Sequence, residues 1–147
     1  MYQHKNKAWL SDDETILIAD FMEKMQHFPF KERDRGIKSI LRGRVMMMRE
    51  EVDEFSKAVD DLDMAELADA LVDLVYYAKG TAVILNLPWS DLFTIVHEAN
   101  MKKVSGQTKR GLAEDAAKPE GWQPPNVRKV LEDHNHGVQI EFEDSVD

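Results

Sequence analysis

Two clusters of acidic residues carry the strongest chemical signal in this sequence. The first follows an apolar run and the second lies inside an apolar segment; their members are Glu50, Glu51 and Glu54, and then Glu66, Asp69 and Asp73. On an α-helix, residues three or four positions apart lie on the same face. Each cluster therefore presents a row of carboxylates, and carboxylate oxygens are the ligands that Mg²⁺ takes from proteins.

The second cluster is the stronger signal because of the segment around it. Residues 64–78 read MAELADALVDLVYYA, and the three acids are its only charged residues. A helix that is apolar on nearly every side is buried on more than one face, so its carboxylates are expected to be buried too. Buried carboxylates without a cation are costly, and few Lys or Arg residues lie nearby. Two antiparallel helices are therefore predicted to hold Mg²⁺ between four carboxylates, those of Glu51, Glu54, Glu66 and Asp69.

Each cluster also has an interpretation without a metal. Residues 63–66 fit a capping box at the start of a helix. Residues 50–54 fit a solvated helix face. A capping box does not account for Asp69 or Asp73, so the two clusters together favour a metal site. His97 is a lone histidine and is left outside this site.

Hydrophobic periodicity predicts helices and very little else. Helices joined by short turns pack antiparallel, so the expected fold is all-α with a four-helix-bundle-like core over about residues 11–104. A substrate loop over about 105–125 follows, and this single domain is expected to end near residue 136. The acidic tail, 137–147, is expected to be disordered or to contact a partner, with VQIEF as an alternative strand. The helices are expected over about 11–27, 37–60, 64–86, from 89 to before Gly106, and 127–133.

The second helix carries two neighbouring stripes. The apolar stripe is expected to face the core, and its members include Val45, Met48, Val52, Phe55 and Val59. The adjacent stripe contains Arg44, Met47, Glu51, Glu54 and Ala58. Glu51 and Glu54 are therefore expected side by side at the edge of the core.

The overall composition limits the class of protein. The chain has 147 residues, no cysteine, and 28 Asp and Glu against 19 Lys and Arg, for a formal net charge of −9. Nucleic acid is not expected as a partner of such a chain, because nucleic-acid binding depends on Lys and Arg displacing counterions. No segment approaches the ~20 apolar residues of a membrane span, and the polar N-terminus lacks a secretory signal. We expect a cytoplasmic protein with no membrane partner, no disulfides and no cysteine nucleophile.

The acidic pattern also resembles that of a known family. Glu50-Glu51-x-x-Glu54 followed by Glu66-x-x-Asp69 is similar to the EExxE…ExxD signature of the all-α nucleoside triphosphate pyrophosphohydrolases, the MazG-like superfamily. The resemblance covers roughly residues 16–131. Its further stretches are ELADALVDLVYY (66–77), HEANMKK (97–103) and KPEGWQPP (118–125).

The resemblance implies an enzyme that hydrolyses a phosphoanhydride bond. The expected reaction is Mg²⁺-dependent and converts a nucleoside triphosphate, with a deoxynucleotide favoured, to the monophosphate and pyrophosphate. Two or more ions are expected per site, with Mn²⁺ as a substitute. Their ligands would be Glu51, Glu54, Glu66 and Asp69. Glu50 would orient the attacking water as a base or hold a further ion, and Asp73 would support the same catalytic site.

Substrate contacts are implied at six further residues. Asn100 and Lys103 share a helix face, and with Lys118 they are expected to contact the triphosphate. Trp122 would either close over the substrate or serve as a packing anchor. The set is completed by Arg44, which precedes the glutamates, and by Tyr76, a candidate for the base pocket.

Two other functions stay open. Phosphoribosyl-ATP pyrophosphohydrolase shares the helical fold and the acidic motifs, although that substrate gives no reason for Asn100 or the KPEGW stretch. The other alternative is a non-catalytic module that binds nucleotides or a basic partner. A di-iron carboxylate bundle is excluded because the chain has no Glu-x-x-His pair.

The third helix also predicts an assembly. In a single four-helix bundle, one side of each helix is exposed to solvent, yet residues 67–78 place apolar side chains around most of the helix. A partner subunit is the expected cover. Together with the resemblance, this predicts a homodimer, or a homotetramer built as a dimer of dimers.

Overall fold

The structure is a computed structural model that describes residues 13–25 and 36–134. The chain is mostly helical, which confirms the predicted all-α fold class. None of the described helices is long and apolar enough to cross a bilayer. The predicted cap at Ser11, the predicted helix end at His27 and the tail 137–147 lie outside the described residues. The elements are α1 (Asp13–Lys24), α2 (Ile37–Asp61), α3 (Met64–Ile84), α4 (Trp89–Met101), β1 (Val104–Gly106), β2 (Asp115–Ala117) and α5 (Val127–Asp133).

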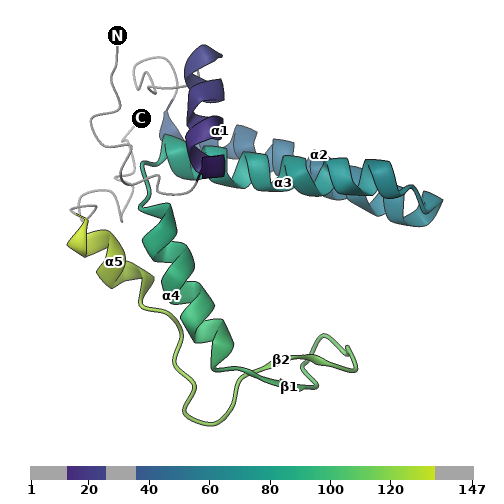
Figure 1. The fold of residues 1–147 in the computed structure, drawn as a ribbon, viewed down its shortest axis with the longest axis vertical. Coiled ribbons are helices and arrows are strands. Elements are labelled where there is room, and N and C mark those ends of the chain that lie inside the picture. Colours follow the sequence, from purple (N-terminus) through teal and green to yellow (C-terminus); the bar gives the residue numbers. More distant parts are fainter. Residues whose placement is uncertain (1–12, 26–35, 135–147) are drawn as a thin grey trace. The chain divides into compact units, whose positions relative to one another are not determined.

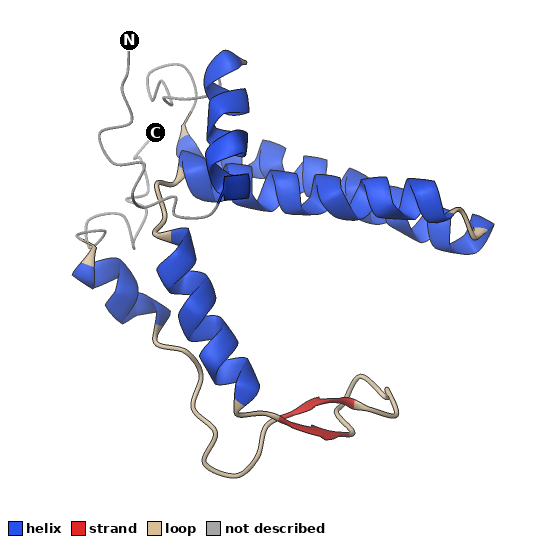
Figure 2. Ribbon diagram, in the orientation of Figure 1, coloured by secondary structure: helices blue, strands red, loops and turns tan. Residues whose placement is uncertain are grey.

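The described chain forms two compact units that meet in sequence between Leu87 and Pro88. The first unit contains α1, α2 and α3, and the second contains α4, both strands and α5. Figure 2 distinguishes the helices from the two strands by colour. The packing of a fourth helix into one bundle, and a single domain ending near residue 136, stay predictions.

A tight turn makes α2 and α3 an antiparallel pair, and the two helices lie side by side along their length (Figure 1). Leu62 adopts the left-handed conformation, with φ of 53°, and the Asp63 N–H donates to the Ala58 carbonyl over 3.0 Å. The Asp63 carboxylate then accepts from the backbone N–H groups of Ala65 and Glu66, at 3.0 and 3.2 Å. Asp63 therefore helps to end α2 with its backbone and begins α3 with its side chain.

Helix α1 packs on the C-terminal half of α3. Their contact is a small buried apolar cluster, which consists of Ile18, Ala19, Met22 and Val83. At its edge, the Lys79 ammonium pairs with the Glu14 carboxylate over 2.8 Å. This contact fixes the end of α3 that is farther from the turn with α2.

The prediction of which face of α2 is buried was wrong. Val45, Val52 and Val59 are 42, 51 and 43% exposed, whereas Arg44, Glu51 and Ala58 are the buried residues of this helix. The buried residues recur every seven positions, which is one stripe of a helix. A single neighbouring helix covers only the stripe that faces it, and α3 covers the stripe that contains Glu51.

The second unit contains a β-hairpin that the sequence did not indicate. β1 and β2 pair antiparallel, with Val104 opposite Ala117 and Gly106 opposite Asp115. The prediction of a loop over 105–125 was therefore incomplete. Strands of three residues, made mostly of small side chains, are too short to show the period-two alternation that identifies a strand.

Candidate active site

Glu51 is the buried acid of the predicted metal site. Its side chain projects from the face of α2 that packs on α3, and the residue is only 8% exposed. Among the residues that the structure describes, its buried Oε2 atom has no hydrogen-bond partner. A buried carboxylate oxygen without a partner loses its hydration and gains nothing in return, so this atom is an open acceptor in the protein interior.

Acidic side chains from both helices act on Glu51. Burial raises the pKa of Glu51, and the negative charges of Glu54, Asp73, Asp69 and Glu50 raise it further. Asp69 and Asp73 belong to α3, so the antiparallel pair brings the two predicted clusters into one electrostatic environment. Each added negative charge makes ionisation of Glu51 less favourable unless a cation is present.

The remaining acids reach toward water. Glu50, Glu54, Glu66 and Asp69 are exposed, and Asp73 is half-buried. Glu66 belongs to the first turn of α3, where Asp63 supplies the helix cap. A complete capping box would also need the Glu66 side chain to bind the Asp63 N–H, which instead bonds to Ala58. The cap therefore leaves the Glu66 carboxylate available.

The donor chemistry of this helix pair fits a hard divalent cation. Within residues 13–25 and 36–134, no three acidic or imidazole side chains lie close enough together to hold a metal ion as they stand. Mutual repulsion between carboxylates favours such separation when no cation is bound. The open Oε2 atom of Glu51 and the carboxylates around it are nevertheless oxygen ligands of the kind that Mg²⁺ takes.

Arg44 lies between α2 and α3. It is 8% exposed, its Nε donates to the Thr81 hydroxyl over 3.1 Å, and its Nη2 donates to the Tyr77 carbonyl over 3.0 Å. Its guanidinium carbon lies 5.3 Å from the centre of the Tyr77 ring. These contacts tie Arg44 to α3, and its contact with substrate stays a prediction.

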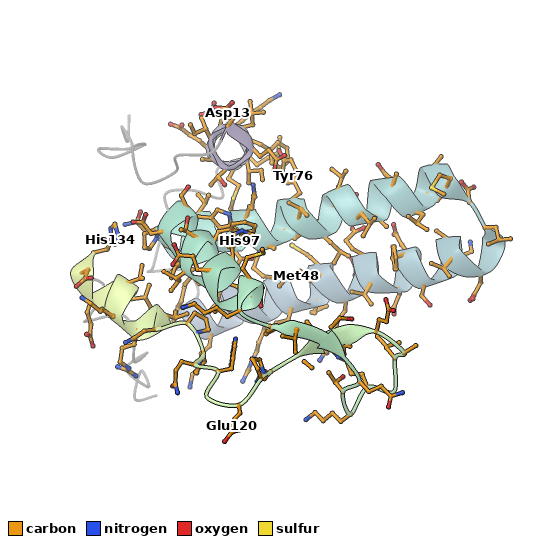
Figure 3. The ribbon with its side chains drawn as sticks, turned by 60° about the horizontal axis from the view of Figure 1, so that its bottom comes forward. Asp13, Met48, Tyr76, His97, Glu120 and His134 are labelled. Atoms are coloured by element: carbon orange, nitrogen blue, oxygen red, sulfur yellow. The ribbon has the colours of Figure 1, made fainter. Side chains whose placement is uncertain are left out.

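Tyr76 faces α1. Its ring meets the Phe21 ring edge-on, with centroids 5.5 Å apart, and Figure 3 shows its side chain near α1. It packs at the margin of the buried cluster between α1 and α3. A role in binding the base stays a prediction.

Two of the predicted substrate contacts line a hollow in the second unit. The hollow has a volume of about 410 Å³, within the roughly 300–1,000 Å³ range of small-molecule sites. Asn100 lies in the last turn of α4, whereas Lys103 follows the end of that helix at Met101. The prediction that this helix continues to before Gly106, with Lys103 on it, was therefore wrong. The rest of the lining comes from the hairpin. The full lining is Asn100, Lys103, Val104, Ser105, Glu114, Asp115 and Ala116.

Trp122 holds two lysines beside this hollow. Its indole N–H donates to the Ala99 carbonyl over 2.8 Å, which ties the loop to α4. The Lys103 and Lys118 ammonium groups lie 5.3 and 4.8 Å from its ring centre, within the range of a cation–π contact. The aromatic ring thus brings together two cations that the sequence separates by fifteen positions. Direct contact between Trp122 and substrate stays a prediction.

Asp115 organises the hairpin wall of the hollow. Its carboxylate accepts hydrogen bonds from the Thr108 hydroxyl and the Ala116 N–H, and it forms two bonds with Arg110, at 2.7 and 2.9 Å. These bonds lower the pKa of Asp115, with Thr108 the largest cause. Because the folded state lowers this pKa, the stabilisation is present above the ordinary value near 3.8 and is lost as pH falls through the lowered one.

The sequence did not indicate several residues of these sites. Tyr77, Gly80 and Thr81 surround Arg44, and a glycine inside an apolar helix was the available signal for a close approach. Asp115 and the rest of the hairpin wall were missed with the hairpin itself. Gly111, which has φ of 75°, was the available signal for a turn there.

The described fold is all-α, with rows of carboxylates on two paired helices. Comparison with known families gives the class of protein. A family model described as phosphoribosyl-ATP pyrophosphohydrolase matches residues 18–100, which is more than half of the chain. The chain therefore belongs to the phosphoribosyl-ATP pyrophosphohydrolase family, which is part of the all-α nucleoside triphosphate pyrophosphohydrolase superfamily. No curated protein matches the chain.

The family indicates an activity of the pyrophosphohydrolase type, in which water cleaves a phosphoanhydride bond. The matched range contains α2, α3 and nearly all of α4, and so it includes both acidic clusters and Asn100. Lys103, the hairpin, Lys118 and Trp122 follow the matched range. The part of the chain that resembles the family is thus the acidic part, and most of the cationic contacts lie beyond it.

Replacing Asp115 tests the order of the hairpin wall. Asp115→Asn removes the charge that Arg110 binds, so the loop between the strands is expected to open more often. Trypsin cleaves after Lys109 and Arg110, both in this loop, and cleavage there at pH 8 should become several-fold faster. Mass spectrometry of a digestion time course measures the rate.

Glu114→Gln is the matched control for this variant, because Glu114 is the neighbouring exposed carboxylate and makes none of these bonds. It should be cleaved at the wild-type rate. Equal cleavage rates for the Asp115→Asn variant and the wild-type protein would contradict the organising role of Asp115.

Proposed function

We propose that this protein is a Mg²⁺-dependent pyrophosphohydrolase that converts a nucleoside triphosphate, in particular a deoxynucleotide, to the monophosphate and pyrophosphate. The observation that carries the proposal is the buried Glu51 carboxylate, with its open Oε2 atom, surrounded by acids of α2 and α3. Such a site gains stability from a hard cation, and a triphosphate is a substrate that reaches acidic side chains through cations.

The ligands proposed for Mg²⁺ are the carboxylates of Glu51, Glu54, Glu66 and Asp69. When bound, Mg²⁺ offsets the charge of the triphosphate and lowers the pKa of a coordinated water. Glu51 is the fixed member of this set because its side chain is buried, while the exposed Glu54 and Glu66 are free to adjust. Asp73, half-buried on α3, supports Glu51 from the opposite helix.

Glu50 is the proposed base. It is exposed on α2, next to Glu51, where it can accept a proton from an attacking water. The oxygen of that water forms a new bond to phosphorus, and the bond between the α- and β-phosphates breaks. The pyrophosphate leaves with the electron pair of the broken bond, and the water proton passes to Glu50.

The cations of the second unit are proposed to bind the phosphates. Lys103 lines the hollow with Asn100, and Lys118 shares the Trp122 ring with Lys103. Ammonium groups held on an aromatic ring keep N–H donors for phosphate oxygens. Asn100 adds a neutral donor and acceptor on the same helix end.

Phosphoribosyl-ATP is the second candidate substrate, and the family match favours it. It carries the same triphosphate group, so the reaction and the acidic site would be the same. Phosphoribosyl-ATP differs from a simple nucleoside triphosphate in its additional phosphoribosyl group. The contacts of Lys103, Lys118 and Trp122 lie beyond the matched range, so the family match does not account for them.

A panel of normal and modified nucleoside triphosphates, with phosphoribosyl-ATP included, tests the reaction. With Mg²⁺ present, chromatography should show a nucleoside monophosphate and pyrophosphate. Glu51→Gln and Glu66→Gln should each lower kcat/KM by about 100-fold, since each removes one proposed ligand charge. Turnover of phosphoribosyl-ATP alone would select the second candidate.

Asp53→Asn is the matched control for the acidic site, because Asp53 is an exposed acid of the same helix on another face. This variant should keep the activity of the wild-type protein. Full hydrolysis by both glutamine variants would rule out the proposed metal site. Tight nucleotide binding without any product would instead indicate a non-catalytic module.

Lys103→Ala tests the proposed phosphate contact. A charge-assisted hydrogen bond is worth roughly 1.5–3 kcal/mol, so the KM for the triphosphate should rise by about 10- to 100-fold. The exposed neighbour Lys102, which does not line the hollow, supplies the control variant Lys102→Ala. If both variants raise KM equally, the effect reflects net charge and the specific contact is absent.

We propose further that the protein assembles as a homodimer or homotetramer. Apolar side chains are open on both helices of the acidic pair, and they are Val45, Val52 and Val59 on α2, and Leu71, Val72 and Val75 on α3. Apolar surface of this extent favours a partner. Light scattering after size-exclusion chromatography should give a dimer or tetramer mass, and a monomer at working concentration would contradict the assembly.

A further inference from the structure

The buried guanidinium of Arg44 has no evident role in the chemistry proposed above. Arginine is rarely buried in proteins without a charged partner, because removing its charge from water is costly. Among the described residues, Arg44 instead contacts a hydroxyl, a backbone carbonyl and an aromatic face of α3, and the Met47 sulfur of its own helix. The three contacts with α3 connect the two helices that carry the acids.

Residues of α3 fit closely around the Arg44 guanidinium. A Cβ atom at Gly80 would lie 2.5 Å from Nη2 of Arg44, so glycine at this position makes room for the guanidinium. The Thr81 hydroxyl, which accepts from Nε, itself donates to the Tyr77 carbonyl over 2.7 Å. Tyr77 supplies both the carbonyl for Nη2 and the ring beneath the guanidinium. Arg44 therefore fits one position along α3 and one rotation of α2.

The same contact sets the position of the acids. Arg44 and Glu51 are seven residues apart on one face of α2, which is about two turns. Gly80 and Asp73 are also seven residues apart, in the opposite direction on α3. Because the two helices are antiparallel, a pairing of Arg44 with Gly80 also places Glu51 opposite Asp73, seven residues farther along each helix. A one-residue slip rotates a helix face by about 100° and shifts it by about 1.5 Å, which would turn Glu51 out of the interface.

We propose that Arg44 is a positioning residue that sets the register of α2 against α3, and that it thereby places the carboxylates of both helices around the divalent ions. The forked guanidinium suits this role because it reaches two acceptors and an aromatic face at once, which a single ammonium cannot do. The proposal rests on the proposed metal site for its effect on ion binding. The register itself is a property of the metal-free chain.

This role differs from a substrate contact in what it predicts. A residue that binds substrate changes the KM for the nucleotide at saturating metal. A residue that positions the carboxylates changes the affinity for the metal ion and the arrangement of the two helices. Mn²⁺ is a suitable probe, because its binding can be followed by electron paramagnetic resonance in the absence of any nucleotide.

Three variants separate the parts of the contact. Arg44→Met keeps a long, unbranched side chain and removes every hydrogen-bond donor of the guanidinium. In this variant the Tyr77 carbonyl still accepts a hydrogen bond from the Thr81 hydroxyl, so the protein is expected to fold. Gly80→Ala displaces the guanidinium without removing it. Thr81→Ser keeps the hydroxyl and serves as the control. Circular dichroism verifies that each variant is folded.

Register is measured with spin labels. The chain has no cysteine, so cysteines introduced at Ser39 and Ala68, exposed sites on α2 and α3, carry the only labels. Double electron–electron resonance then reports the distance between labels without metal. Arg44→Met and Gly80→Ala should broaden or shift this distance distribution, whereas Thr81→Ser should leave it as in the parent protein.

In unlabelled protein, the Mn²⁺ dissociation constant should rise about tenfold in Arg44→Met and in Gly80→Ala, as for other residues that orient metal ligands, with the KM at saturating Mn²⁺ nearly unchanged. Unchanged label distances with unchanged Mn²⁺ affinity would overturn the proposal. So would a raised KM alone, which would make Arg44 a substrate contact. If the parent protein binds no Mn²⁺, the proposed function fails, and the label distances alone decide whether Arg44 sets the register.

Discussion

The packing of like charges between two helices is the constraint on which the rest of this structure depends. Glu51 points from α2 toward α3 and is buried, with one oxygen unpaired and acids of both helices around it. In a protein interior such a group destabilises the fold unless something compensates for it. The turn at Asp63 and the buried Arg44 hold the pair together despite that repulsion.

Carboxylates and cations are concentrated in different segments of the chain. The first unit presents carboxylates on α2 and α3. The segment from Lys102 to Lys118 contains five Lys and Arg residues but only two acids, although the whole chain has a net charge of −9. Within that segment, Arg110 pairs with Asp115, and Trp122 gathers Lys103 and Lys118. In general, cations bind the oxygens of a polyphosphate group, and carboxylates hold the metal ions that accompany it.

The positions of helices were predictable from the sequence wherever the local signals were strong. The expected helices at 37–60 and 127–133 agree with α2 and α5 to within one residue, because caps and apolar periodicity mark their ends. Which side of α2 packs on α3 was not predictable, because Val45 and Val52 form as regular a stripe along the helix as Arg44 and Glu51. Which stripe is buried depends on the neighbour, and the apolar stripe is open in the single chain. The hairpin and the Gly80 contact were missed because their signals are only a few residues long.

The most direct test of the account is the position of bound metal. Crystals grown with Mn²⁺ and a non-hydrolysable nucleoside triphosphate give an anomalous signal that locates each ion without reference to any model of the site. If the proposed site is correct, ions lie at about 2.1 Å from carboxylate oxygens of both helices, with Glu51 and Asp69 among the ligands. Ions bound only by phosphate and water, or only by residues outside α2 and α3, would contradict it.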